Sequence, residues 1–150
     1  MNLPLFPLLL RLRTLLQSLS LLILAGIASA ADLPADARAH AERAANAFLA
    51  LVDAGRFDES YIQTSSLFRN AVAQDGWSRV VRATRDPLGA VKSRIHSESR
   101  YSTTMAGAPD GEYVTLRYET TFERKASAVE TLTTMRDSDG QWRVAGYFIK

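Results

Sequence analysis

Apolar side chains recur at two different spacings along this chain, and the spacing changes near residue 87. Up to residue 86 the spacing is helical, with the clearest stripe formed by Ala37, Ala41, Ala44, Ala45, Phe48 and Val52. Asp32, Pro34 and Asp36 are typical of a helix start, and Gly55 of a helix end. The pattern predicts three shorter helices after Gly55, at 57–62, from Ser65 or Ser66 onward, and at 77–85. Their expected interior positions are Phe57, Tyr61, Ile62, Leu67, Phe68, Ala71, Val72, Trp77, Val80, Val81 and Thr84.

From residue 90 onward, apolar and polar positions alternate with a period of two, which indicates β-strands. The first strand is expected to turn Val91 and Ile95 toward the interior and Arg94 and His96 toward solvent. The second is expected to turn Val114, Leu116, Tyr118, Thr120 and Phe122 to one face. The third covers about 128–136 and the last 141–149, where period two places Trp142 with Val144, Gly146 and Phe148. Between them, Asp137-Ser138-Asp139-Gly140 predicts a hairpin turn.

Helices that come first and strands that follow indicate an α+β fold. One sheet face is apolar and the other is charged, as expected when helices cover an antiparallel sheet on one side only. We therefore expect N-terminal helices packed on one face of a curved sheet of about four antiparallel strands. A chain of this length is expected to form one domain, here residues 31–150, after a separate leader.

The first thirty residues have the features of a secretory signal peptide. Arg11 and Arg13 precede a leucine-rich apolar segment, and Ala28-Ser29-Ala30 supplies the small residues of a cleavage site. Residues 1–30 are therefore expected to be removed by cleavage between Ala30 and Ala31. The alternative is an uncleaved membrane anchor, but the apolar run after Arg13 is shorter than the ~20 residues that a spanning helix needs. We expect a periplasmic or secreted domain with no membrane span after the leader is removed.

Composition excludes several classes of function. The chain has no cysteine, which excludes a disulfide scaffold, a thiolate nucleophile and iron–sulfur or cysteine-ligated zinc sites. Its 150 residues include 18 basic and 16 acidic side chains, and two of the basic ones lie in the leader. The remaining residues are electrically balanced, which argues against nucleic acid as a partner.

Several short segments resemble one known family. They are FLALVDAGRF at 48–57, LFR at 67–69, Trp77, RDPLG at 85–89, PDGEY at 109–113 and GQWRVAGYFI at 140–149. In this order and spacing they resemble the bacterial exported family of unknown function DUF4019, over roughly residues 38–150. The resemblance implies a cystatin-like or NTF2-like cone, in which helices lie in the concave face of the sheet. It implies no activity, cofactor or catalytic residue.

Few residues are of a type and spacing that suggest catalysis or metal binding. His40 and His96 lie far apart and match no metal-ligand spacing, so we expect neither a metal nor a cofactor. The segment starting at Asp137 lacks the glycine and the bidentate acid of a calcium loop. An isomerase or dehydratase of this fold would need a buried carboxylate with a raised pKa. Asp53, Glu119 and Glu130 are the candidates, and solvated carboxylates are the favoured interpretation.

Charge is uneven along the chain. Arg79, Arg82 and Arg85 recur every three residues in the last predicted helix, which suggests a surface for a ligand or partner. A solvated helix face explains the same pattern. The sequence therefore favours a non-enzymatic module that binds a small molecule or an envelope protein, at these arginines or in a cavity under the sheet. A buried-carboxylate isomerase or dehydratase is the alternative.

Overall fold

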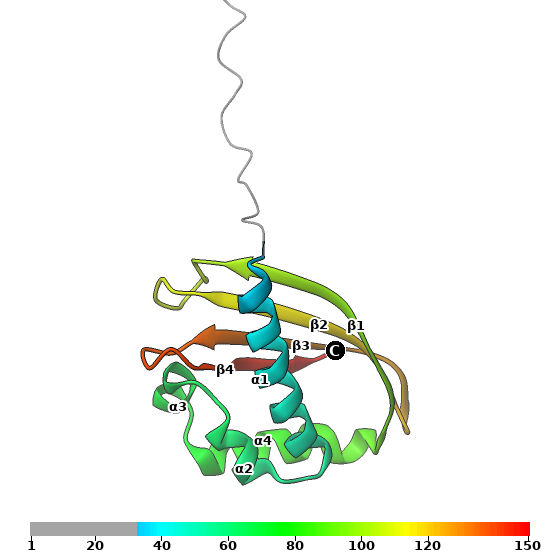
Figure 1. Cartoon of the computed structure of the whole chain (residues 1–150). Helices are drawn as coiled ribbons and strands as arrows, with labels where there is room; N and C mark the ends of the chain where they lie inside the picture. The colour runs from blue at the N-terminus through cyan, green and yellow to red at the C-terminus, as the bar shows by residue number, and fades with distance from the viewer. Residues whose placement is uncertain (1–32) are drawn as a thin grey trace, which may run out of the picture.

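The computed structural model describes residues 33–150, so the predicted signal peptide and the cleavage after Ala30 lie outside the described residues. Helices come first and strands follow, which confirms the predicted α+β fold (Figure 1). The helices are α1 (Ala35–Asp53), α2 (Phe57–Ile62), α3 (Ser66–Ala71), α4 (Gln74–Arg85) and the short 3-10 turn η1 (Asp86–Leu88). The strands are β1 (Val91–Ser102), β2 (Tyr113–Phe122), β3 (Lys125–Arg136) and β4 (Trp142–Ile149).

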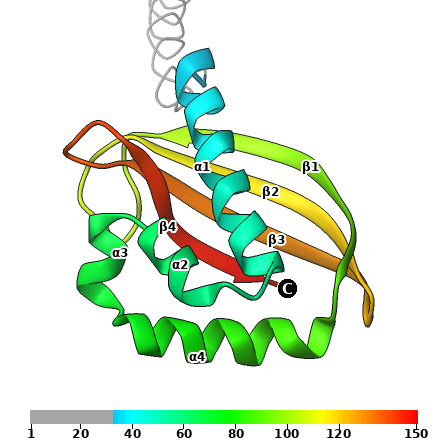
Figure 2. The same cartoon turned by 60° about the horizontal axis from the view of Figure 1, so that its bottom comes forward.

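The strands form one antiparallel sheet in the order β1-β2-β3-β4, so that each strand pairs with its neighbour in the sequence. The sheet curves around α1, which crosses its concave face, while α2, α3 and α4 lie together beyond β4 (Figures 1 and 2). No helix within residues 33–150 covers the convex face. This one-sided cover explains why apolar and polar positions alternate along β2.

The core lies between α1 and the concave face. The buried residues of α1 are Ala37, Ala41, Ala45, Phe48, Leu49 and Val52, so the predicted stripe is confirmed, with Ala44 half-buried at its margin. Three alanines in this stripe keep the helix close to the strands. Phe48 is fully buried, and its ring lies 5.7 Å from that of Trp77 and 5.5 Å from that of Tyr147.

Four of the predicted interior positions on the shorter helices are wrong, because Ile62, Ala71, Val80 and Thr84 are exposed. Ile62 is 65% exposed and Val80 is 63% exposed. On α4 the buried residues are Trp77, Val81 and Arg85, spaced four apart. This stripe is narrower than the predicted one because α4 packs mainly on the six-residue α2 and not on the sheet.

The predicted inward face of β1 is also wrong. Ile95 is 64% exposed, whereas Arg94 and His96 point inward, Arg94 to buried Glu130 and His96 to the ring of Tyr118. The alternation of apolar and polar residues assigns charged side chains to solvent. It carries no information about Glu130, the buried carboxylate that binds Arg94 on the concave side. The pairing of β1 with β2 also shifts between His96 and Glu98.

The predicted inward face of β4 is wrong at Phe148, and the cause differs from that in β1. Gly146 pairs with Thr133 and Val144 with Thr134, so one residue of β4 bulges out between them. The bulge moves the inward position from Phe148 to Tyr147, which leaves Phe148 55% exposed. Trp142, before the bulge, packs half-buried against the core as expected.

Candidate functional site

Six polar side chains meet at one end of the concave face, where α1 and α4 end. They form the buried ion cluster, which consists of Asp53, Arg85, Arg94, Thr120, Glu130 and Tyr147. Each comes from a different helix or strand, namely α1, α4, β1, β2, β3 and β4. The cluster therefore exists only when the whole domain is folded.

Glu130 is the centre of the cluster and is fully buried. Its carboxylate accepts hydrogen bonds from Arg94 Nε (2.6 Å), Thr120 Oγ1 (2.6 Å) and Tyr147 Oη (2.5 Å). Burial by itself raises the pKa of Glu130, but the three donors and the positive charge of Arg94 outweigh it, so that the pKa lies below its usual value. Glu130 is thus held as an anion.

Asp53 provides the second negative charge, at the last residue of α1. It accepts bidentate hydrogen bonds from Arg94, with Nη1 at 2.7 Å and Nη2 at 3.0 Å. A third hydrogen bond comes from Arg85 Nη2 at 2.7 Å. Its side chain is 29% exposed, which makes it the most accessible charged group of the cluster. The two arginines balance the two carboxylates, so the cluster has no net charge.

Arg94 and Tyr147 are both held in their protonated forms. Desolvation lowers the pKa of Arg94, but its hydrogen bonds to Asp53 and Glu130 raise the pKa by more, so the net effect is an increase. Burial and the neighbouring charge of Glu130 raise the pKa of Tyr147. Glu130 therefore keeps its negative charge, and Arg94 and Tyr147 keep their protons.

Arg85 differs from the other members because it is incompletely bonded. Its side chain is 5% exposed and its guanidinium lies 4.5 Å from the centre of the Phe122 ring. Nη1 lies 4.0 Å from Glu130 Oε1, beyond hydrogen-bond distance. Among the described residues, neither Nε nor Nη1 of Arg85 has a hydrogen-bond partner.

A cleft of about 330 Å³ lies beside Arg85 and Asp53. Its lining residues are Val52, Asp53, Gly55, Phe57, Arg85, Asp86, Gly89 and Ala90. The backbone φ of Gly89 is +74°, a conformation that residues with a Cβ rarely adopt, so the wall of the cleft favours glycine there. Two members of the cluster, Asp53 and Arg85, thus line this cleft.

The predicted arginine surface does not form as three residues on one face. The side chain of Arg79 is 78% exposed and Arg82 lies over the Phe57 ring at 5.1 Å, whereas Arg85 is buried in the cluster. In an α-helix, residues three positions apart point about 60° away from one another. Three such residues therefore spread over about a third of the helix circumference. A binding role for Arg79 and Arg82 stays a prediction.

The histidines are separate from the cluster. His40 Nδ1 lies 2.7 Å from Arg43 Nη2 on the exposed side of α1, and His96 Nε2 lies 2.8 Å from Ser99 Oγ. Within residues 33–150 no three His, Cys, Asp or Glu side chains are grouped to hold a metal ion. None of the helices in this part of the chain is long and apolar enough to cross a bilayer.

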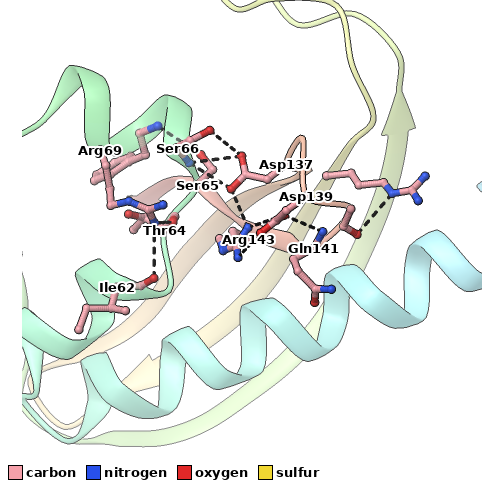
Figure 3. Close-up of polar contacts among 12 residues, drawn as sticks. Ile62, Thr64, Ser65, Ser66, Arg69, Asp137, Asp139, Gln141 and Arg143 are labelled. Carbon is pink, nitrogen blue, oxygen red and sulfur yellow. Dashed lines mark hydrogen bonds and ion pairs between the residues drawn. The ribbon is translucent and has the colours of Figure 1, made fainter.

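A second polar network joins the β3–β4 turn to α3 (Figure 3). Asp137 accepts hydrogen bonds from Ser66 N at 3.1 Å, Ser66 Oγ at 2.8 Å and Arg143 Nη1 at 2.9 Å. Hydrogen bonds from Arg143 and from the backbone N–H of Gln141 lower the pKa of Asp139 to about 2. This network fastens the predicted hairpin turn to the helices and does not line the cleft at Arg85.

A larger cavity, of about 440 Å³, lies on the convex face near the loop between β1 and β2. Its charged residues are paired with one another, because Glu98 lies 3.4 Å from Arg100 and 3.3 Å from Arg117. None of its lining residues is buried, whereas the cleft at Arg85 adjoins the buried ion cluster, which makes the cluster and its cleft the candidate site.

The fold and the site define a class: an α+β domain whose curved four-stranded sheet encloses a neutral cluster of buried charges. The chain belongs to the family described as "Protein of unknown function (DUF4019)", whose model matches residues 44–147. All six cluster residues lie inside this match. No curated protein and no solved structure matches the chain.

Sequence reasoning missed Arg94 as a site residue and took Glu130 for a solvated carboxylate. One signal for Glu130 was present, because period two places it on the same strand face as Leu132, which is fully buried. No comparable signal marks Arg94, since its neighbours in β1 are mostly polar.

Proposed function

We propose that this protein is an exported domain of the cell envelope that binds a small molecule or another protein and catalyses no reaction. The proposal rests on one observation above all: the only fully buried carboxylate among the described residues, Glu130, is an anion saturated by donors. The signal-peptide features of residues 1–30 support the exported location.

The alternative, an isomerase or dehydratase, needs a carboxylate that takes up and releases a proton near neutral pH. The lowered pKa of Glu130 acts against that role, and its complete burial keeps a substrate away. Asp53 is more accessible, but both of its oxygens are bonded to arginines. A carboxylate bound by two arginines suits recognition and structural support better than proton transfer.

Export is tested by expressing the full chain with a C-terminal tag in a Gram-negative bacterium and sequencing the N-terminus of the recovered protein. We expect protein in the periplasmic fraction that begins at Ala31. Recovery in the membrane fraction with Met1 still present would support the uncleaved anchor instead.

Binding without catalysis is tested by incubating the purified protein with a small-molecule extract of the same bacterium, followed by mass spectrometry. A binding module retains a compound unchanged. Conversion of a compound by the wild-type protein, but not by Asp53→Asn, would establish the isomerase or dehydratase alternative. Glu119→Asn provides the control, because Glu119 is an exposed carboxylate on the convex face of β2.

A protein partner bound through the exposed arginines would show a different signature. Attraction to Arg79 and Arg82 should weaken as the Debye length shrinks from ~10 Å at 0.1 M salt to ~3 Å at 1 M. A ligand held in the cleft is screened less, so the salt dependence separates these two modes of binding.

A further inference from the structure

The buried ion cluster leaves one feature unexplained: Arg85 lines the cleft, and two of its guanidinium nitrogens are buried without an acceptor. Buried guanidinium N–H groups almost always have partners, since each unpaired buried donor lowers stability. The cluster supplies only one bond to Arg85, through Nη2 to Asp53. The missing acceptor is therefore the first indication of what the cleft binds.

We propose that the cleft binds a small zwitterion of the amino-acid type, with its carboxylate at Arg85 and its ammonium group at Asp86. This inference rests on the proposed function as a binding module and names the site and the ligand class. A ligand carboxylate at this wall supplies the acceptor that Arg85 lacks, in a charge-assisted hydrogen bond.

Three features of the cleft favour a positive group on the same ligand. Asp86 is exposed and stands outside the ion pairs of the described chain, so its charge is free to attract an ammonium group. The cleft is lined by the last residues of α1 and α4, Asp53 and Arg85, and helix C-termini carry partial negative charge. The charged lining residues sum to one net negative charge, which disfavours a phosphate or another polyanion.

The remaining wall is apolar and the volume is small. Val52 and Phe57 are almost fully buried and line the cleft beside the backbone of Gly55, Gly89 and Ala90. About 330 Å³ is at the lower end of small-molecule sites. An amino acid with an aliphatic side chain matches both the volume and the apolar wall.

The probes that test the inference are L-leucine and its two halves: 4-methylpentanoate, which lacks the ammonium group, and 3-methylbutylamine, which lacks the carboxylate. Each is titrated into ¹⁵N-labelled protein purified from cells that express the full chain. We expect L-leucine to cause saturable shifts of the amide signals of Gly55, Gly89 and Ala90. Each half should bind about tenfold more weakly, because it has lost one charged contact.

Two variants locate the site without disturbing the cluster. Asp86→Asn should weaken L-leucine binding about tenfold and leave 4-methylpentanoate binding unchanged, while Ala90→Leu should block the cleft and abolish both. Asp110→Asn, which removes an exposed carboxylate in the loop between β1 and β2, is the matched control and should bind like the wild type. An unchanged amide spectrum away from the cleft shows that each variant is folded.

The inference is overturned if L-leucine causes no saturable shifts, if the shifts lie outside the cleft, or if Asp86→Asn binds L-leucine as tightly as the wild type. Such a result leaves binding of another partner intact, so it does not reject the proposed function. That function fails separately, if mass spectrometry shows that the protein converts a compound.

Discussion

Tyr147 donates its phenolic hydrogen to Glu130 across the β3–β4 pair, with 2.5 Å between the two oxygens. The residues are diagonal neighbours on the concave face, since Tyr147 pairs with Leu132 and Glu130 with Ile149. The Tyr147 ring also packs edge-on against Phe48 and Trp77. One side chain thus joins the apolar core to the buried ion cluster.

Removing this hydroxyl should destabilise the domain. Tyr147→Phe keeps the ring but leaves Glu130 with two donors, so we expect a loss of about 2 kcal/mol in the free energy of unfolding, measured by urea denaturation. Tyr101→Phe is the control, because the Tyr101 hydroxyl makes only a 3.4 Å contact with Glu112 and should change stability by less than about 0.5 kcal/mol. Equal effects of the two variants would contradict the structure.

Neutralising Glu130 should have a larger effect. In Glu130→Gln the two arginines share the single carboxylate of Asp53, which leaves a buried positive charge uncompensated. We expect a loss of about 3–5 kcal/mol, again by urea denaturation. Glu119→Gln on the convex face should stay within about 0.5 kcal/mol of the wild type. A loss of about 3–5 kcal/mol in Glu119→Gln as well would show that burial of Glu130 does not cause the effect.

The lowered pKa of Glu130 also predicts acid sensitivity. Its folded-state pKa lies below the unfolded value of about 4.3, so the unfolded chain takes up a proton first as the pH falls. The stabilisation is complete above about pH 5 and is lost as the pH drops through 4.3 toward the folded-state pKa. We expect the urea midpoint to fall between pH 6 and pH 3, and to fall less in Glu130→Gln. Asp139, whose pKa is lowered to about 2, contributes to the loss of stability at acid pH in both the wild type and Glu130→Gln.

The sequence predicted the elements and their order because both depend on local periodicity. Helical spacing located α1 through the stripe that ends at Val52, and period two located β2. The inward residues of β1 and β4 were mispredicted for non-local reasons. A bulge in β4 makes Tyr147 the inward residue instead of Phe148. Arg94 points inward because it binds Asp53 and Glu130, which lie on other elements. A buried charge network is specified by its partners, and pairing between distant segments cannot be derived from one strand's pattern.

The three arginines of α4, which look equivalent in the sequence, should differ in their effect on stability. Arg85→Ala removes a buried partner of Asp53 and should cost about 3–5 kcal/mol. Arg82→Ala removes only an exposed contact with the Phe57 ring, worth about 0.5–1 kcal/mol. Thermal unfolding of both variants, with Arg79→Ala as a reference whose side chain is 78% exposed, checks this order. Three similar melting temperatures would place Arg85 outside the cluster.

The attachment of the β3–β4 turn to α3 gives the last prediction. Asp137 is 7% exposed and accepts two hydrogen bonds from Ser66, the first residue of α3, and one from Arg143 (Figure 3). Asp137→Ala removes the acceptor for an N-terminal N–H of this short helix, so we expect a loss of about 2–3 kcal/mol.

Hydrogen exchange distinguishes this local attachment from a general loss of stability. In Asp137→Ala the amides of α3 should exchange faster than those of α1, because a six-residue helix has little stability of its own. Asp139→Ala is the matched control: it removes a carboxylate that also binds Arg143 but is 53% exposed, and it leaves the bonds to Ser66 in place. Uniform acceleration across the domain in Asp137→Ala would mean that α3 is held by its apolar contacts, with Phe68 against Trp77, and not by the turn.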